Sequence, residues 1–188
     1  AELCSVRTGE TDCLRGDSSP AFEAWQLFRL PPVLALGAGV MLGLTPTTDL
    51  PERQLEGIQR EQSRRYLTIE ATGRVYPYVR DAFEAWGGVT AGLVVVSDSF
   101  DTEIDSGMDK PLIGSGGGII RTEGFTSTLA GGVAYELRRG WSVGGTLRIG
   151  AWFLPADPKL SPLGDQASLT GRASYFVASL VAAYRVPL

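Results

Sequence analysis

The stretch RYLTIEATGRVYP, residues 65–77, decides the fold of this chain, because alternate positions along it have opposite chemistry. Successive side chains of a β-strand point to opposite sides, so the stretch predicts a strand with one apolar face and one polar, charged face. The apolar face contains Leu67, Ile69, Ala71, Gly73 and Val75, and the polar face contains Tyr66, Thr68, Glu70, Thr72, Arg74 and Tyr76. In a soluble sheet protein the apolar face lines the core, whereas in a membrane barrel it faces lipid and the charges lie inside.

Six further segments have the length and pattern of strands, which favours an all-β fold. Several reach the ~9–11 residues of a membrane-spanning strand, whereas an ordinary strand has about 5–6. Short turns, expected at 31–32, 77–83 and 138–140, alternate with long polar connections at 45–64, 98–123 and 155–168, an asymmetry typical of outer-membrane barrels. The seven expected strands are 21–30, 33–44, 65–76, 85–97, 124–137, 141–154 and 169–186.

Aromatic residues bracket the aliphatic positions on one face of three expected strands, as in the two interfacial girdles of a membrane barrel. A strand of about twelve residues, at ~3.3 Å each and tilted by ~40°, covers roughly 30 Å along a barrel axis. The apolar faces are therefore expected to point to lipid. The expected girdle residues are Phe125, Tyr135, Trp141, Phe153, Phe176 and Tyr184.

The opposite faces carry small residues and isolated charges, which suit a narrow interior better than a solvent-exposed surface. The chain has 15 arginines and only two lysines, Lys110 and Lys159, whereas soluble domains spread lysine over their polar faces. Arginine forms several hydrogen bonds at once, and unpaired buried charge is costly, so charges in a narrow lumen are expected to pair. The residues expected to form ion pairs in the lumen are Glu70, Arg74, Glu136, Arg148 and Arg185.

The chain resembles the small outer-membrane β-barrels of bacteria, similar to the eight-stranded outer membrane protein A type. The resemblance covers about residues 21–186 and rests on strand pattern, loop asymmetry, the turn VYPYV at 75–79, and glycine-rich strands such as WSVGGTLRIGAWF at 141–153. It implies a closed antiparallel up-and-down transmembrane barrel of about eight strands in the bacterial outer membrane. A start at AELC is compatible with a mature chain whose signal peptide has been removed.

Two features depart from that family pattern. Bacterial single-chain barrels normally have an even number of strands, and only seven are readable here. The source of an eighth strand stays open among a short strand within 1–7, an upstream strand that was removed, and a strand supplied by a partner. The chain also ends in AAYRVPL, with Tyr184 set back from the end, where such barrels usually end in an aromatic residue.

Residues 1–20 are expected to form a loop segment ahead of a barrel domain at 21–188, with part of a first strand as an alternative. The only cysteines, Cys4 and Cys13, flank a Thr-Gly-Glu reversal that suits a tight turn, and a disulfide between them is expected. A disulfide indicates an oxidising compartment, such as a periplasm or a cell exterior.

The composition excludes several kinds of chemistry. The chain has no histidine, so Ser–His–Asp and Cys–His catalysis and imidazole metal sites are not available, and we expect neither an enzyme nor a cofactor. A net charge of −4 with dispersed basic residues gives no basic footprint for nucleic acid. Asp101, Glu103 and Asp105 are a weak Ca²⁺ candidate, and a solvated acidic loop is the alternative. A short helix within 47–65 is a further expectation.

Three functions are consistent with these patterns. The first is a structural or interaction protein of the outer membrane, in contact with lipid, with loops at the cell surface and a lumen plugged by Arg–Glu pairs. The second is a soluble or periplasmic barrel that binds an apolar ligand, with the apolar faces inside. The third is a subunit of an envelope complex, in which a partner binds the long loops or adds a strand to an open edge.

Overall fold

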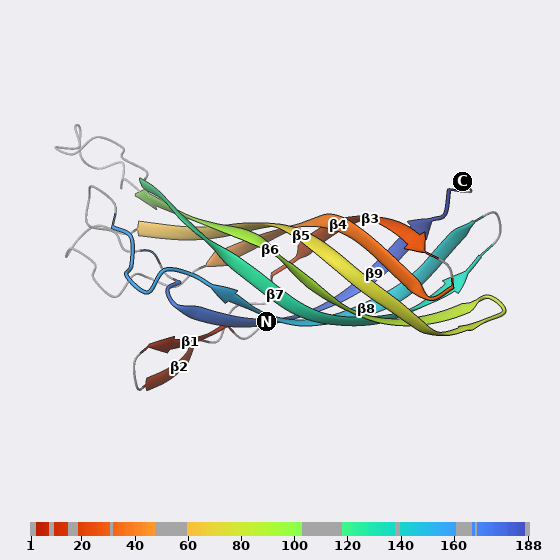
Figure 1. Cartoon of the computed structure of the whole chain (residues 1–188). Helices are drawn as coiled ribbons and strands as arrows, with labels where there is room; N and C mark the ends of the chain where they lie inside the picture. Colours follow the sequence, from red (N-terminus) through yellow and green to blue (C-terminus); the bar gives the residue numbers. More distant parts are fainter. Residues whose placement is uncertain are drawn as a thin grey trace.

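The computed structural model describes residues 3–7, 10–14, 19–30, 32–47, 60–102, 118–137, 140–160, 167 and 169–186. Seven long strands form one antiparallel sheet in which each strand pairs with the next along the chain (Figure 1). They are β3 (Ala21–Leu30), β4 (Leu34–Thr47), β5 (Arg60–Arg80), β6 (Phe83–Thr102), β7 (Gly118–Glu136), β8 (Trp141–Phe153) and β9 (Arg172–Tyr184). The expected all-β fold with seven up-and-down strands is therefore confirmed.

A small hairpin of β1 (Leu3–Arg7) and β2 (Glu10–Leu14) precedes these seven strands. β1 pairs with β9 through two positions only, Cys4 opposite Ser174 and Ser5 opposite Ala173. The hairpin lies beside the end of the sheet that carries the long connections, hereafter the loop end (Figure 1). The opposite end carries the short turns and is hereafter the turn end.

Four strands, β4 to β7, run further toward the loop end than their hydrophobic pattern indicates, and β4 reaches Thr47. Residues 60–65 of β5 pair in continuous register with 97–102 of β6, and β7 begins at Gly118. Polar residues in these extensions still exchange backbone hydrogen bonds with a neighbour, so the ladder continues after the apolar alternation has ended. The connections expected at 45–64 and 98–123 are accordingly shorter, whereas the one expected at 155–168 extends from 154 to 171. Of the expected helix within 47–65, position 47 and positions 60–65 lie in strands, and the remainder lies outside the described residues.

The turn expected at 77–83 is much tighter in the structure. β5 continues to Arg80, and only Asp81 and Ala82 form the turn. The register of β5 against β6 shifts between Val75 and Tyr78, which marks a bulge. Proline cannot donate a ladder hydrogen bond, and a bulge is a place where a strand accepts it, so Pro77 does not end β5.

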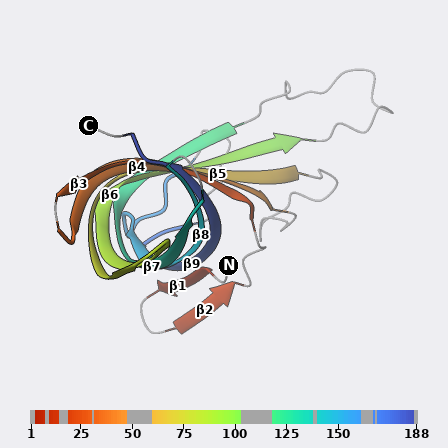
Figure 2. The same ribbon diagram turned by 90° about the vertical axis from the view of Figure 1, so that its right-hand side faces the viewer.

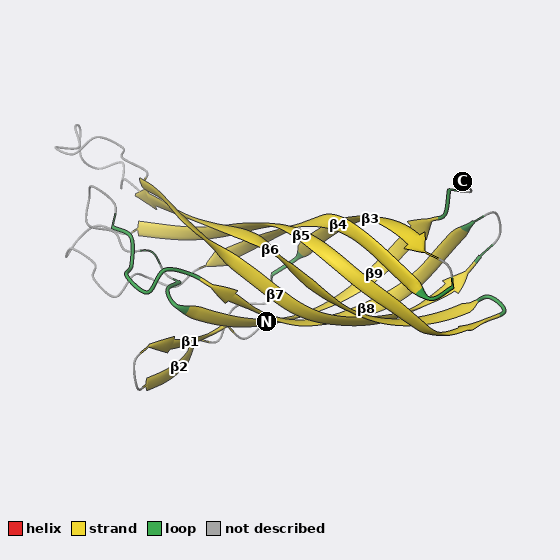
Figure 3. Cartoon of the chain, in the orientation of Figure 1, coloured by secondary structure: helices red, strands yellow, loops and turns green. Residues whose placement is uncertain are grey.

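The sheet curls around an axis that runs from the turn end to the loop end (Figure 2). Its strand order is β2-β1-β9-β8-β7-β6-β5-β4-β3, so β3 forms one edge and has no strand on its second side. The closed barrel expected from the sequence is therefore not confirmed. The described residues contain strands, turns and loops but no helix (Figure 3), and so no helix long and apolar enough to cross a membrane.

The curl gives the sheet a concave inner face and a convex outer face, and it settles which side of 65–77 faces inward. Thr68 and Glu70 are buried on the inner face, whereas Leu67 and Ile69 are 41% and 57% exposed on the outer face. The same alternation runs along the whole of β3. The apolar alternate positions of these strands thus lie on the outer surface of the sheet.

Candidate functional site in the interior of the curled sheet

Arg148 of β8 lies at the centre of the interior and is 2% exposed. Its Nη2 contacts Oε2 of Glu70 on β5, and its Nη1 lies 3.1 Å from Oε2 of Glu23 on β3. All three side chains occupy inward-facing positions of their strands and therefore lie on the concave face. The curl brings strands β3, β5 and β8 around the same interior (Figure 2). Hydrogen bonds between ionised partners are stronger than neutral ones, so this triad links three strands across the interior.

Hydroxyl groups and the indole N–H of Trp25 donate further hydrogen bonds to the two carboxylates. Thr68 and Thr90 each donate to Glu70 at 2.8 Å, and Ser179 of β9 donates to Glu23 at 2.9 Å. A buried ion pair is tolerated when its geometry is good and further hydrogen bonds complete it. We refer to Glu23, Thr68, Glu70, Thr90, Arg148 and Ser179 as the central cluster.

Toward the turn end, Arg74 lies against two indole rings. Its guanidinium carbon is 4.0 Å from the ring centroid of Trp86 and 5.3 Å from that of Trp25. Arginine stacks favourably on the faces of aromatic rings. The sequence predicts an ion pair for Arg74 in the lumen, but aromatic rings surround its guanidinium instead, and the carboxylate of Glu70 contacts Arg148.

A second group of charges lies at the turn end. Glu84 accepts from Arg29 at 2.6 Å and from Arg185 at 2.9 Å, and Arg185 lies 3.6 Å from Glu136. These side chains are more exposed than the central cluster, with Arg185 54% exposed. Solvent screening therefore makes each of these pairs weaker than the Arg148 pairs.

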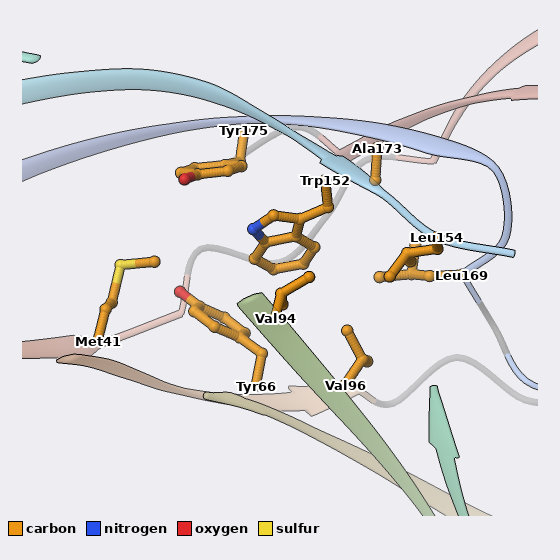
Figure 4. Close-up of a cluster of buried hydrophobic side chains, with 9 residues drawn as sticks. All are labelled: Met41, Tyr66, Val94, Val96, Trp152, Leu154, Leu169, Ala173 and Tyr175. Atoms are coloured by element: carbon orange, nitrogen blue, oxygen red, sulfur yellow. The ribbon is translucent and has the colours of Figure 1, made fainter. Parts of the chain in front are cut away.

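An aromatic and aliphatic layer fills the interior toward the loop end (Figure 4). The indole of Trp152 lies between the rings of Tyr66 and Tyr175, with centroid distances of 4.9 and 5.1 Å. The Tyr175 hydroxyl is within 2.6 Å of Thr128 Oγ1. This aromatic layer consists of Met41, Tyr66, Val94, Val96, Trp152, Leu154, Leu169, Ala173 and Tyr175.

The connection between β8 and β9 contributes to this layer. Leu154 donates its backbone N–H to Gly171 at 2.7 Å, and Gly171 donates to Pro155 at 2.9 Å, which closes the base of the connection. Leu169 is 2% exposed and packs with Leu154 inside the sheet (Figure 4). Closer to the loop end than this layer, Arg64 and Asp98 form a buried ion pair at 3.1 Å.

The structure brings some of the expected lumen residues together and adds others. Glu70 contacts Arg148, and Arg185 lies near Glu136, but these two pairs belong to separate groups. Sequence reasoning missed Glu23, Arg29 and Glu84. In AFEAWQLFRL (21–30) the charges share one parity, opposite Phe22 and Phe28, so alternation could have found Glu23 and Arg29. Glu84 precedes the expected start of its strand at residue 85, which concealed it.

The six expected girdle residues are all exposed on the outer face, between 47% and 66%. Trp141 and Tyr184 are opposite one another at the turn end, with ring centroids 5.1 Å apart. Phe125 and Phe153 are opposite one another toward the loop end. Tyr135 is opposite Val143, close to the first pair. Phe176, in contrast, is opposite Ile149, four residues from Phe153.

The remaining expected site residues fall partly or wholly outside the described residues. The backbone register of β1 and β2 places Cys4 directly opposite Cys13, but their side chains are not among those described, and the disulfide stays a prediction. Glu103 and Asp105 lie outside the described residues, and Asp101 is described only as a backbone position of β6. Within the described part of the chain, acidic, cysteine and histidine side chains form no group suited to a metal ion.

No protein-family model matches this chain, and no curated protein or solved structure matches it at a significant level. The role of the interior is therefore inferred from its geometry alone. Each carboxylate of the central cluster accepts hydrogen bonds from a guanidinium and at least one hydroxyl, and the aromatic layer lies over it. Such an arrangement fills and cross-links an interior.

Proposed function

We propose that this protein is a non-enzymatic outer-membrane β-barrel with a structural or interaction role, whose interior is plugged by ion pairs. The observation that carries this proposal is the reversed distribution of polarity. Buried Glu70 and Arg148 lie on the concave face, while large apolar side chains are exposed around the convex face. This is the polarity of a lipid-facing barrel, in which charges lie inside and aliphatic residues outside.

The outer apolar band supports contact with lipid. On β7 the outward positions from Phe125 to Tyr135 carry no charge, and the same holds for β8 from Trp141 to Phe153. The ten residue-to-residue steps from Phe125 to Tyr135, at ~3.4 Å each and tilted by ~40°, cover about 25 Å, the height of an outer-membrane apolar band. Toward the loop end, the first exposed charges beyond this band are Arg65, Arg121, Glu123 and Arg172.

Detergent dependence tests the membrane assignment. The folded protein is run on size-exclusion chromatography with detergent at micellar concentration and again after the detergent is removed. We expect a β-rich, monodisperse particle with detergent and aggregation without it, because a monomer rarely keeps so large an exposed apolar surface in water. A monodisperse particle in plain buffer would contradict a membrane location.

Conductance tests the plug. In planar lipid bilayers we expect no large, stable channel, because the central cluster and the aromatic layer occupy the interior at two levels. Barrels of about eight strands leave room only for side chains. Steady openings of porin size would refute the plug while leaving the membrane assignment intact.

A role in an envelope complex is a second candidate, and the open edge of β3 favours it. An unpaired strand edge readily adds a strand from another polypeptide. Isolation of the protein only in a complex would support this role. The soluble barrel with an apolar ligand has less support, because charged and hydroxyl groups occupy the centre of its interior.

A further inference from the structure

The two outermost long strands, β3 and β9, approach each other without pairing. β3 pairs only with β4, and β9 pairs with β8 and with two residues of β1. The link across the gap is a side-chain hydrogen bond from Ser179 to Glu23, at 2.9 Å. We refer to the strip between β3 and the 176–184 part of β9 as the seam.

Strand direction prevents the seam from closing in the pattern of the rest of the sheet. Each of the seven long strands is antiparallel to the next, so β3 and β9, the first and the seventh, run in the same direction. Closing the sheet directly would require one parallel pair. One added strand between them would be antiparallel to both and would leave no open edge.

Exposure along β9 indicates that a neighbour is missing at the seam. From Leu180 to Tyr184 the side chains at inward-facing and outward-facing positions are all exposed, and Leu180 is 97% exposed. On β8, which has neighbours on both sides, the inward positions Ser142 and Gly144 remain partly buried. The seam therefore leaves apolar side chains and backbone hydrogen-bonding groups uncovered together.

The pairing of β1 with β9 indicates the direction and the register of a strand that fits the seam. β1 is antiparallel to β9 and lies on its open side, with Cys4 opposite Ser174, at the loop end of the seam. Continued in the same register, a strand leading into Cys4 reaches Tyr184 ten positions earlier. About ten residues is the length of a membrane-spanning strand.

We propose that one extended strand, continuous with the N-terminal side of β1, fills the seam and pairs with both β3 and β9. It runs from the turn end to the loop end, in the register that β1 already has against β9. Its outward residues, those opposite Ala178, Leu180 and Ala182, are apolar, and its inward residues are small enough to lie beside Glu23 and Trp25. This proposal rests on the proposed function, because it assumes that the outward face meets lipid.

The chain itself supplies a probe for the test. The segment LALGAGV of β4, residues 34–40, runs in the required direction and has the required alternation, with Leu36 and Val40 outward and Gly37 and Gly39 inward. Joined ahead of Ala1, these seven residues together with residues 1–3 make up the ten positions before Cys4. A control carries proline in place of both glycines of the added segment, which removes backbone donors without changing length.

Amide hydrogen exchange in detergent micelles, read by mass spectrometry over 21–30 and 176–184, is compared among the 188-residue chain, the extended chain and the proline control. We expect exchange in both segments to slow by roughly tenfold or more in the extended chain alone. Protected amides of β6 and β7 show that each protein is folded, and if the proline control does not fold, the 188-residue chain is the reference.

Three results would overturn the proposal. Protection of both edges in the unextended monomer would mean that β3 and β9 pair directly. Protection in a dimer, identified by light scattering, would mean that a second copy covers the seam. Unprotected edges in a folded extended chain would mean that such a strand does not bind there. None of these three exchange results contradicts the proposed function. Failure of the proposed function would be shown by a folded protein that stays monodisperse after the detergent is removed.

Discussion

Arg148 shows how a single residue organises the interior. Its guanidinium reaches carboxylates on two strands that lie far apart in sequence, Glu23 and Glu70. Lysine has one compact ammonium group and cannot hold two carboxylates with a planar fork in the same way. The preference of this chain for arginine thus has a structural reason at this position.

Replacing Arg148 by methionine is expected to destabilise the fold by about 3–5 kcal/mol, because Glu70 and Glu23 would remain buried without their cation. The free energy of unfolding is measured by urea titration of the protein in lipid vesicles. The double variant Arg148→Met/Glu70→Gln is expected to recover part of the loss. Arg80→Met, at a position 76% exposed, serves as the control, and equal losses for Arg80→Met and Arg148→Met would contradict the role of the central cluster.

Gly43 shows a second residue-scale requirement, the space for an inward aromatic ring. The ring of Tyr66 occupies the place where a Cβ on Gly43 would stand, whereas a Cβ on Gly87 would meet nothing within 4 Å. Glycine at position 43 thus lets the aromatic layer approach the backbone of β4.

Gly43→Ala is therefore expected to cost about 1–3 kcal/mol, since Tyr66 must move within a packed layer. Gly87→Ala is expected to change stability by no more than about 0.5 kcal/mol. Both are measured by the same urea titration. A difference between the two variants smaller than the error of the titration would show that the ring moves freely.

At the scale of an element, strand pairing in the hairpin of β1 and β2 sets the two cysteine positions opposite one another. Five residue pairs hold the two strands in register, and the second of them places Cys4 opposite Cys13. Directly opposed residues of antiparallel strands have Cα atoms about 4.5–5.5 Å apart, which lies within the range that disulfides bridge. The register therefore supports the disulfide that the cysteine spacing predicts.

We expect Cys4 and Cys13 to be joined when the protein is isolated from an oxidising compartment. The protein is unfolded in denaturant without reductant, treated with an alkylating reagent and weighed by mass spectrometry. No alkyl group should be added, and two should be added after reduction. Two alkyl groups without reduction would show free thiols and remove the argument for that compartment.

For the whole molecule, the proposed membrane location depends on the position of the outer apolar band. Leu129 and Ile119 both face outward on β7 and are 67% and 62% exposed. Leu129 lies in the middle of the band, between Phe125 and Tyr135, whereas Ile119 lies beyond it, past Arg121 and Glu123. The two positions thus form a matched pair that differs in depth.

Leu129→Arg is expected to cost about 2–4 kcal/mol in lipid vesicles, and Ile119→Arg about 0–1 kcal/mol, because the cost of a lipid-facing charge depends on depth. The free energy of unfolding by urea is the measurement. In a water-soluble protein both substitutions would be nearly neutral, since both side chains are exposed. Equal, small effects would therefore speak against lipid around the band.

The sequence by itself determined the local properties of this protein. Alternation of period two indicated all seven long strands and divided the side chains of residues 65–77 between two faces, because a strand assigns each side chain to a face without reference to the rest of the fold. The bracketing aromatics and the scarcity of lysine then favoured the apolar face as the outer one. The same pattern also identified Glu70 and Arg148 as inward charges.

Only the tertiary structure decided which inward residues meet. Glu23 contacts an arginine 125 positions away because the sheet curls, and Arg74 faces Trp25 and Trp86 instead of a carboxylate for the same reason. The extensions of β4 to β7 and the bulge before Tyr78 depend on backbone pairing, which side-chain polarity does not encode. The open seam is a property of strand count and direction, so it emerged only when all the strands were placed together.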